Sequence, residues 1–168
     1  ETMRETIGEE MIIAEDLGML TVAVHEMLSR TGYPGMKVLQ FAFDEDATQE
    51  YLPHNYTNNY VVYTGTHDND TSRGWFEKLV PRKQKFVLRY TGAENGHGVV
   101  WALIRAAMMS VADTAIIPMQ DYLNLGSLAR INTPSTIGDN WKWRLRPGEL
   151  SQALAESMHE LAEVYGRL

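Results

Sequence analysis

Apolar residues in this chain fall into short runs that are separated by segments of helical periodicity. Runs rich in Ile, Val, Tyr and Phe, bounded by Gly, Pro, Asn or Asp, predict four strands at residues 11–14, 36–43, 60–65 and 114–119. Strands that alternate with helices favour a parallel sheet, because parallel neighbours need a long crossover and a helix supplies it. The pattern therefore predicts an α/β fold.

Helical periodicity is clearest in four segments. They lie at residues 21–32, 81–90, 99–111 and 149–168. Val24, Met27 and Leu28 share one face of the first segment, and Gly32 suits a left-handed residue just past its end. Apolar stripes are expected in the last two segments, at Val100, Leu103, Ile104, Ala107, Met108 and Val111 and at Leu150, Leu154, Met158, Leu161 and Val164. No repeat or linker divides the chain, so residues 1–168 are expected to form one domain.

The composition is that of a globular protein. The chain has 168 residues, 44% of them hydrophobic, which is enough to bury a core. A formal net charge of −7 disfavours nonspecific binding to nucleic acid or anionic membranes, and no apolar run approaches the roughly 20 residues that span a bilayer. The absence of cysteine excludes disulfides and permits a reducing compartment. We expect a cytoplasmic protein with no nucleic-acid or membrane partner, and the start at Glu1 suggests a piece of a longer polypeptide.

Acidic residues follow three of the predicted strands. Glu15 and Asp16 come after the first strand, the run "THDND" at residues 66–70 after the third, and Asp121 after the fourth. In parallel sheets and barrels, polar side chains just past the carboxyl ends of strands line the ligand crevice. We therefore expect these carboxylates to converge on one face.

Each of these carboxylates also has a structural interpretation. Asp16 could fix a turn, whereas Asp70 and Asp121 could cap helices. The segment "DNDTSRG" suggests a calcium loop, but Arg73 stands where an EF-hand needs Gly and Leu79 where it needs a bidentate Glu. The histidines are scattered rather than spaced as zinc ligands. No metal or other cofactor is expected.

A pair of carboxylates that needs neither metal nor thiol suits glycosidic bond cleavage. One carboxylic acid protonates the leaving oxygen, while an ionised carboxylate attacks or stabilises an oxocarbenium-like centre. Glu15 suits the acid role, because strand alternation would surround it with apolar neighbours that favour its protonated form. Asp68 suits the ionised role, with hydrogen bonds from His67 and Asn69. Some aromatic residues could stack on sugar rings, although core or rim packing is their ordinary role: Tyr56, Trp75 and Trp141.

A set of long motifs runs nearly from end to end of the chain. They are "IIAEDLG", "GYPGMKVLQFAF", "YLPHNY", "VVYTGTHDNDT", the pair "GW" at residues 74–75, "PMQDYLNLGSLARINTPST" and "NWKWRL". In these motifs the chain resembles the C-terminal third of the 4-α-glucanotransferase family, the amylomaltases or disproportionating enzymes of glycoside hydrolase family 77. The resemblance implies a (β/α)8 TIM barrel, of which residues 1–168 would form the C-terminal half with the fifth to eighth strands. It also implies a retaining transfer of α-1,4-glucan segments from a maltooligosaccharide donor to an acceptor sugar.

The resemblance also implies roles for individual residues. The family's general acid/base glutamate in "EDLG" falls on Glu15, and its transition-state-stabilising aspartate in "HDN" falls on Asp68. His67 matches a residue that contacts the sugar in the −1 subsite, and Asp16 matches a position near the substrate. Together with Asn69, these residues are the expected catalytic and substrate-binding set of the first three strands.

The loop after the fourth predicted strand resembles the family's loop after the eighth strand. Asn132, Pro134, Asn140 and Trp141 match positions in that loop. We expect Asn140 and Trp141 to contact substrate, whereas Asn132 and Pro134 match without an assigned role.

The family's nucleophile has no match in this chain. That aspartate and its companion arginine lie on the family's fourth strand in an "RxDH" motif, which does not occur here. We therefore expect the chain alone to be inactive, and to need the missing N-terminal half of the barrel or to self-associate. Two alternatives remain: an α-amylase-type hydrolase with the same carboxylates, and a noncatalytic half-barrel that binds glucan or a partner.

Overall fold

A small parallel sheet forms the centre of the structure, a computed structural model that describes residues 6, 12–18, 20–43 and 49–168. Its strands are β1 (Gly35–Val38), β2 (Tyr60–Tyr63) and β3 (Thr114–Ile116), in the order β1-β2-β3. Both pairs are parallel, with Val38 opposite Tyr63 and Tyr63 opposite Ile116. The predicted α/β class with a parallel sheet is confirmed.

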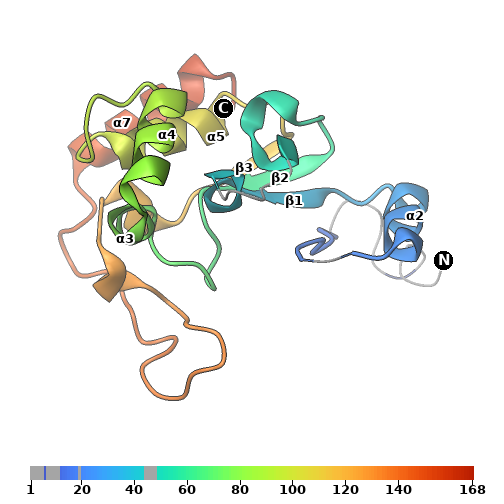
Figure 1. The fold of residues 1–168 in the computed structure, drawn as a ribbon. Coiled ribbons are helices and arrows are strands. Elements are labelled where there is room, and N and C mark those ends of the chain that lie inside the picture. The colour runs from blue at the N-terminus through green and yellow to red at the C-terminus, as the bar shows by residue number, and fades with distance from the viewer. Residues whose placement is uncertain (1–5, 7–11, 19, 44–48) are drawn as a thin grey trace.

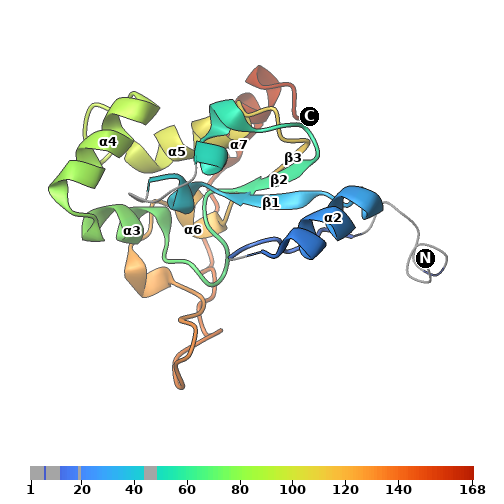
Figure 2. The ribbon, with the colours of Figure 1, turned by 45° about the vertical axis from the view of Figure 1, so that its right-hand side comes forward.

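Helices precede, connect and follow the strands. They are α2 (Val22–Thr31), α3 (Ser72–Lys78), α4 (Pro81–Thr91), α5 (Val99–Met108), α6 (Met119–Tyr122) and α7 (Gln152–Val164). Short 3₁₀ helices lie at η1 (Leu39–Phe43), η2 (Gln49–Tyr51), η3 (Pro53–Asn55) and η4 (Ser127–Ala129). Figure 1 shows α3, α4, α5 and α7 gathered at one side of the sheet. Figure 2 shows α2 on the other side, next to β1.

The hydrophobic core surrounds α5. Val100 and Ile104 are fully buried in one cluster with residues of α3, α4 and α7, whereas Ala106 and Ala107 belong to a second cluster that contains Val62 of β2. The expected apolar stripe of this helix is confirmed except at Val111, which follows the helix and is 52% exposed. At the end of this helix Arg167 donates to the carbonyl of Met108 at 2.6 Å, which satisfies an acceptor that the helix end leaves free. Arg167 also donates to the carbonyls of Ser110 and Ala112, at 2.9 and 3.0 Å, in the segment that follows.

The first and last predicted helices form, but they bury fewer apolar residues than expected. The helix α2 ends at Gly32 with a φ of 70°, the left-handed conformation that the sequence predicts. None of its residues is buried, however, and Met27 is 55% exposed. In α7 only Leu161 is buried, while Leu150 precedes the helix and Val164 is 63% exposed. Both helices therefore bury little of their apolar surface against the rest of the described structure.

The strands are shorter than the apolar runs that predict them. The first expected strand is not formed by residues 12–14, and Met11 lies outside the described residues. Residues 39–43 continue β1 as a buried 3₁₀ helix, since an apolar run alone does not distinguish a strand from a buried turn. The strand β3 ends before Pro118, which has no N–H to donate and precedes α6.

Gly74 allows α3 to pack closely against η4. A Cβ at this position would lie 2.8 Å from the Asp70 Oδ1 and 2.8 Å from the Ser127 backbone nitrogen, and closer still to Ser127 Oγ. Ser127 in turn donates to Asp70 Oδ2 at 2.7 Å, and Lys78 donates to the same oxygen at 2.5 Å. The absence of a side chain at residue 74 thus brings η4 within hydrogen-bond reach of the loop before α3.

Replacing Gly74 by Ala is expected to lower the free energy of unfolding by about 1–3 kcal/mol, because overpacking displaces Ser127. Helix propensity alone predicts the opposite sign, since Ala is about 1 kcal/mol better than Gly inside a helix. Urea unfolding followed by circular dichroism measures the difference. Gly126→Ala is the matched control, because residue 126 is extended and a Cβ there has nothing within 4 Å. A Gly74→Ala variant as stable as Gly126→Ala would contradict the packing argument.

Candidate active site

An open cavity of about 620 Å³ lies at the carboxyl ends of the strands. Four residues from the predicted site line it: Glu15, His67, Asp68 and Asn69. Met36, Phe41 and Tyr63 supply apolar and aromatic surface from β1, η1 and β2. Of the carboxylates that were expected to converge on one face, Glu15 and Asp68 line this cavity, whereas Asp16, Asp70 and Asp121 do not.

The loop of residues 65–71, which connects β2 to α3, carries three of these side chains. Asn69 Oδ1 accepts hydrogen bonds from the backbone nitrogen and the hydroxyl of Thr66, both at 2.8 Å. Gly65 lets Gln40 approach, because a Cβ would lie 2.6 Å from Gln40 Nε2. Thr71 ends the loop as the N-cap of α3 and accepts from the Gly74 nitrogen at 3.1 Å. Asn69 thus folds the loop, in addition to lining the cavity.

Asp68 is half exposed and held from the loop that follows η4. Asn132 Nδ2 donates to Asp68 Oδ1 at 2.5 Å, and His67 Nε2 lies 3.4 Å from the same oxygen. Arg130 donates to the Asp68 carbonyl oxygen at 2.6 Å. The Asp68 carboxylate thus lines the cavity and is held through Oδ1 by Asn132.

Glu15 is exposed at the rim of the cavity, in a segment that runs beside β1. The Ala14 nitrogen donates to the Pro34 carbonyl at 2.9 Å, and among residues 12–18 this bond does not extend into the ladder that a strand would form. Ile13 is 45% exposed. The apolar enclosure expected around Glu15 is therefore not formed by the described part of the chain.

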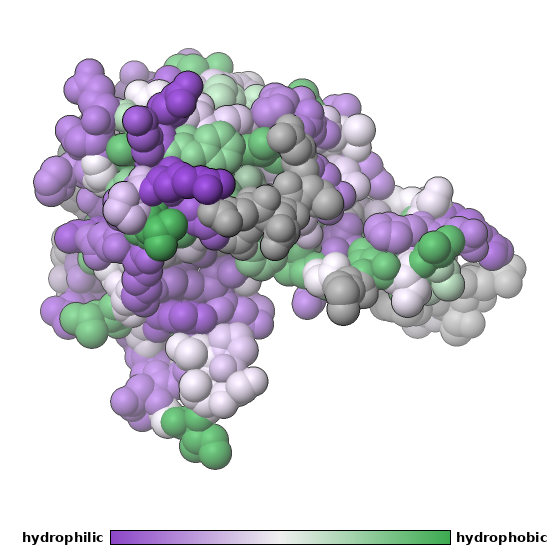
Figure 3. All heavy atoms as spheres, in the orientation of Figure 1, coloured by the Kyte–Doolittle hydropathy of each residue, from purple (hydrophilic) through white to green (hydrophobic). Residues whose placement is uncertain are grey.

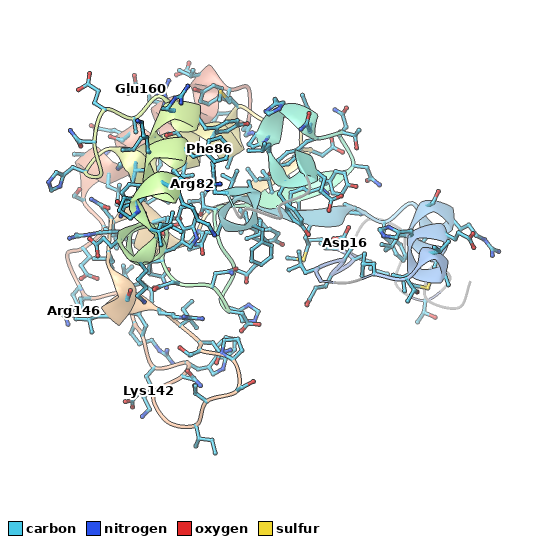
Figure 4. The ribbon with its side chains drawn as sticks, viewed as in Figure 1. Asp16, Arg82, Phe86, Lys142, Arg146 and Glu160 are labelled. Carbon is cyan, nitrogen blue, oxygen red and sulfur yellow. The ribbon has the colours of Figure 1, made fainter. Side chains whose placement is uncertain are left out.

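Asp16 points away from the cavity that contains Glu15. Its Oδ1 accepts from the Met36 backbone nitrogen at 2.6 Å, and a Cβ on Gly35 would collide with the carboxylate. Asp16 lines a second cavity, of about 480 Å³, together with Lys37 and Tyr60; Figure 4 labels it beside β1. The Asp16 carboxylate thus accepts a hydrogen bond from a backbone nitrogen of β1 that would otherwise bond to a neighbouring strand. This bond also explains why residues 12–14 do not form a strand.

Trp141 reaches the site from the projecting segment of residues 131–148 (Figure 1). Its ring lies 5.0 Å from that of His67, at an interplanar angle of 38°. Trp141 has a φ of 63°, which is uncommon for a bulky residue, and its nitrogen donates to the Ile131 carbonyl at 2.7 Å. Strain of this kind occurs where the surroundings fix a residue at a functional site.

Asn140 closes the projecting loop rather than facing the cavity. Its Oδ1 accepts from the Thr133 nitrogen at 2.9 Å, and its Nδ2 donates to the Thr136 carbonyl at 3.1 Å. Hydrophobic atoms lie at the tip of the projection (Figure 3), and Ile137 of this segment is fully exposed. Lys142, on the same projection (Figure 4), pairs with Asp139. Asn140 therefore shapes the segment that presents Trp141.

The remaining acidic residues of the strand ends are structural. Burial acts to raise the pKa of Asp70, but the hydrogen bonds from Lys78 and Ser127 and the lysine charge outweigh it and lower that pKa. Asp121 is 1% exposed, and burial raises its pKa despite hydrogen bonds from Thr64 and Ser72. Asp121 Oδ1 accepts from the Ser72 nitrogen at 2.8 Å. It thus caps α3, a helix distant in sequence, instead of its own helix.

The aromatic candidates other than Trp141 serve in packing. Tyr56 is 7% exposed, and its hydroxyl donates to the Tyr51 carbonyl at 2.7 Å. Trp75 packs against Phe43, with ring centroids 5.8 Å apart. Among the described residues, no group of three His, Asp or Glu side chains is placed to hold a metal ion. The described ranges also contain no helix long and apolar enough to cross a membrane.

Sequence reasoning missed two supports of the site. Arg130 has no assigned role in the sequence, yet it bonds the Asp68 carbonyl and, at 2.7 Å, the Asn132 carbonyl. Asn132 matches a position in the family's loop, but the resemblance assigns it no role. The signal available in the sequence is the two polar residues of "LARIN", Arg130 and Asn132. Nothing local indicates that their partner, Asp68, lies some sixty residues earlier.

Comparison with known proteins gives the relatives of this chain. The family model described as 4-alpha-glucanotransferase, glycoside hydrolase family 77, matches residues 1–151. The chain is 49% identical over 166 residues to a 4-alpha-glucanotransferase of Clostridium butyricum, covering 98% of this chain and 34% of that protein. A 4-alpha-glucanotransferase of Thermus thermophilus is 45% identical, with 100% of this chain and 35% of that protein covered. The chain thus spans about a third of the length of these curated relatives.

Two solved amylomaltase structures also resemble this chain. The amylomaltase from Streptococcus agalactiae in complex with acarbose matches with a TM-score of 0.92 and 35% identity, covering 99% of this chain and 34% of that one. The amylomaltase from Corynebacterium glutamicum, at 17% identity and a TM-score of 0.64, shares the fold. From the extent of the family match and the identity of these relatives, the chain belongs to the 4-alpha-glucanotransferase family, glycoside hydrolase family 77.

Proposed function

We propose that this chain is the C-terminal part of a retaining 4-α-glucanotransferase, which transfers α-1,4-glucan segments between maltooligosaccharides. One observation carries the proposal: Glu15 and Asp68, the two carboxylates assigned by the resemblance, line the same cavity at the carboxyl ends of the strands. Carboxylate pairs at that face of parallel strands are the machinery of glycosidic bond cleavage. The family membership and the acarbose complex of a relative support a glucan-like substrate.

The three parallel strands are proposed to form part of a (β/α)8 barrel, with residues 12–14 in the place of its fifth strand. The match of the whole chain to about a third of an amylomaltase structure supports this assignment. The apolar wall of the cavity, with Met36 and Phe41, is then the part of the barrel interior that the remaining strands face. We propose that the N-terminal half of the barrel covers it, or that copies of the chain associate when that half is absent.

Each residue of the cavity then has a distinct task. Glu15 protonates the glycosidic oxygen as the leaving sugar departs, while an aspartate outside this chain forms the covalent glycosyl intermediate. Glu15, now ionised, takes the proton of the acceptor hydroxyl that attacks the intermediate. Asp68 stabilises the positive charge at the sugar carbon, and Asn132 keeps its carboxylate in place. His67, held against Trp141, contacts the donor sugar.

Asp16, Asn69 and Asn140 are proposed to act on substrate indirectly. Asp16 fixes the start of β1, Asn69 folds the loop of residues 65–71, and Asn140 closes the projecting loop. The Oδ1 atom of each residue is already engaged in one of these bonds, so each sets the position of a neighbouring segment, and Asn69 also lines the cavity itself.

Incubation of the full-length protein with maltotriose tests the function. Glucose together with maltodextrins longer than maltotriose is the expected result, because a transferred segment lengthens an acceptor. Shortening alone would identify an α-amylase-type hydrolase. Binding of maltodextrin without product would favour the noncatalytic half-barrel.

Replacing Glu15 by Gln in the full-length protein is expected to lower transfer by roughly 100-fold to 10,000-fold, the usual range for loss of a general acid. Maltosyl fluoride has a leaving group that needs no protonation, so fluoride release should fall much less. Steady-state kinetics with both donors measures the contrast. Glu77→Gln is the matched control, because Glu77 is exposed and pairs with Arg73 at the surface. An equal loss with both donors would mean that Glu15 is structural.

Replacing Asp68 by Asn is expected to lower turnover by about 100-fold to 1,000-fold, as when other fixed transition-state groups are removed. Folding should persist, because Asn can still accept the hydrogen bond from Asn132. Turnover and the thermal midpoint are measured on the same preparation. Asp113→Asn, at an exposed position before β3, controls for the loss of one negative charge. Retention of most of the turnover would refute the catalytic assignment.

The isolated 168-residue chain is expected to transfer no glucan, because it contains no match to the "RxDH" nucleophile motif. It is also expected to self-associate, since unpaired strand edges and exposed apolar surface favour contact between copies. Light scattering and a maltotriose assay on the purified chain measure both properties. Glucose release above that of a Glu15→Gln chain, or a well-folded monomer, would contradict the corresponding part.

A further inference from the structure

The buried carboxylate of Asp121 bonds both ends of the loop that carries the candidate site. Thr64, directly after β2, donates its hydroxyl to Asp121 Oδ2 at 2.6 Å. Ser72, the first residue of α3, donates its hydroxyl to the same oxygen at 2.7 Å and its backbone nitrogen to Oδ1 at 2.8 Å. All three residues are buried, with exposed fractions of 1% or less. The loop of residues 65–71 is therefore closed on one side chain of α6.

The side chains on this loop depend on where its two ends are held. His67 and Asp68 stand at its exposed turn, beyond the bonds that Asn69 makes to Thr66. Gln40, Arg130 and Asn132 bond the middle of the loop, whereas Asp121 bonds both the residue that follows β2 and the first residue of α3. Movement of either end relative to the other would displace His67 and Asp68 from the cavity wall.

We propose that Asp121 is a positioning residue for the candidate active site, because its carboxylate fixes the loop that presents His67 and Asp68. The inference rests on the proposed function in that the site it positions is the proposed one. Asp121 touches no substrate in this scheme, and it acts through Thr64 and Ser72.

The chemistry of a carboxylate suits the positioning role of Asp121. An ionised Asp accepts several hydrogen bonds and donates none, so it can satisfy two hydroxyls and a backbone nitrogen together. Burial of such a group is costly, and it raises the pKa of Asp121. The carboxylate of Asp70 lies near enough to add to that shift, although Lys78 partly neutralises it. An apolar residue would fill the space without this cost, but it would leave the donors of Thr64 and Ser72 buried and unpaired.

Other bonds to the loop keep a variant folded while its geometry changes. Gln40 Nε2 donates to the Asp70 carbonyl at 2.8 Å, and Arg130 donates to the Asp68 carbonyl at 2.6 Å. Loss of one of the bonds to Asp121 should therefore shift the loop by a fraction of an ångström rather than release it. A misplacement of about 1 Å in an enzyme site can reduce the rate by about 100-fold.

The test uses the full-length protein and the variants Thr64→Val, Thr64→Ser and Asp121→Asn. Val has nearly the shape of Thr but no hydroxyl, Ser restores the hydroxyl, and Asn keeps the volume of Asp while removing its charge. Thr91→Val is the matched control, because the Thr91 hydroxyl donates to the Val87 carbonyl at 2.8 Å within α4, away from the cavity. We measure kcat and KM for maltotriose disproportionation, and amide hydrogen exchange of residues 64–72 against residues 99–108.

Thr64→Val and Asp121→Asn are expected to lower kcat by roughly 10-fold to 100-fold, with a smaller change in KM. Exchange should accelerate in residues 64–72 and stay unchanged in α5, while Thr64→Ser and Thr91→Val should resemble the parent in both measurements. Should Asp121→Asn fail to fold, the Thr64 pair decides the question.

Parental kcat and parental exchange in folded Thr64→Val would overturn the proposal, as would an equal loss of kcat in Thr91→Val or no rescue by Thr64→Ser. If the parent protein itself transfers no glucan, the proposed function fails, but exchange in residues 64–72 still shows whether the bond to Asp121 holds the loop.

Discussion

Burial of α5 is the constraint on which the rest of the structure depends. This helix is apolar on most of its circumference, and its residues belong to both hydrophobic clusters of the molecule. One side packs against the sheet through Val62, and the other against α3, α4 and α7. Since β2 is fixed between β1 and β3 by this packing, the position at which β2 ends is also fixed. The candidate site begins at that point, immediately after the strand.

Hydrogen bonds connect the packed core to the residues that line the cavity. The buried Thr64 and Ser72 connect the sheet and α3 to α6, and the half-exposed Asp68 is connected to the loop after η4 through Asn132 and Arg130. Buried polar groups of this kind are costly unless every donor and acceptor is paired. The site is therefore supported from several segments that are distant in the chain, rather than from one local motif.

Local features of the sequence predicted local structure well. The periodicity located α2, α4, α5 and α7, and Gly32 marked the end of α2 because a left-handed residue suits Gly. Position after a strand brought Glu15 and the loop of residues 65–71 to one cavity, although their chemical roles stay predictions. The contacts that the sequence did not predict depend on distant partners. Asp16 bonds a nitrogen twenty residues later and Asp121 a residue forty-nine positions earlier, so no window of sequence reveals either contact.

The ring contact between Trp141 and His67 has an optical consequence. These residues belong to the projecting segment and to the loop of residues 65–71, which are far apart in sequence but meet at 5.0 Å. Indole emission is sensitive to a neighbouring imidazole, and Trp141 is 55% exposed at the edge of the site. Any event that separates the two loops, or that inserts a sugar ring between them, alters that emission. Trp141, one of the four tryptophans of the chain, thus adds to the intrinsic emission a component that depends on the arrangement of the candidate site.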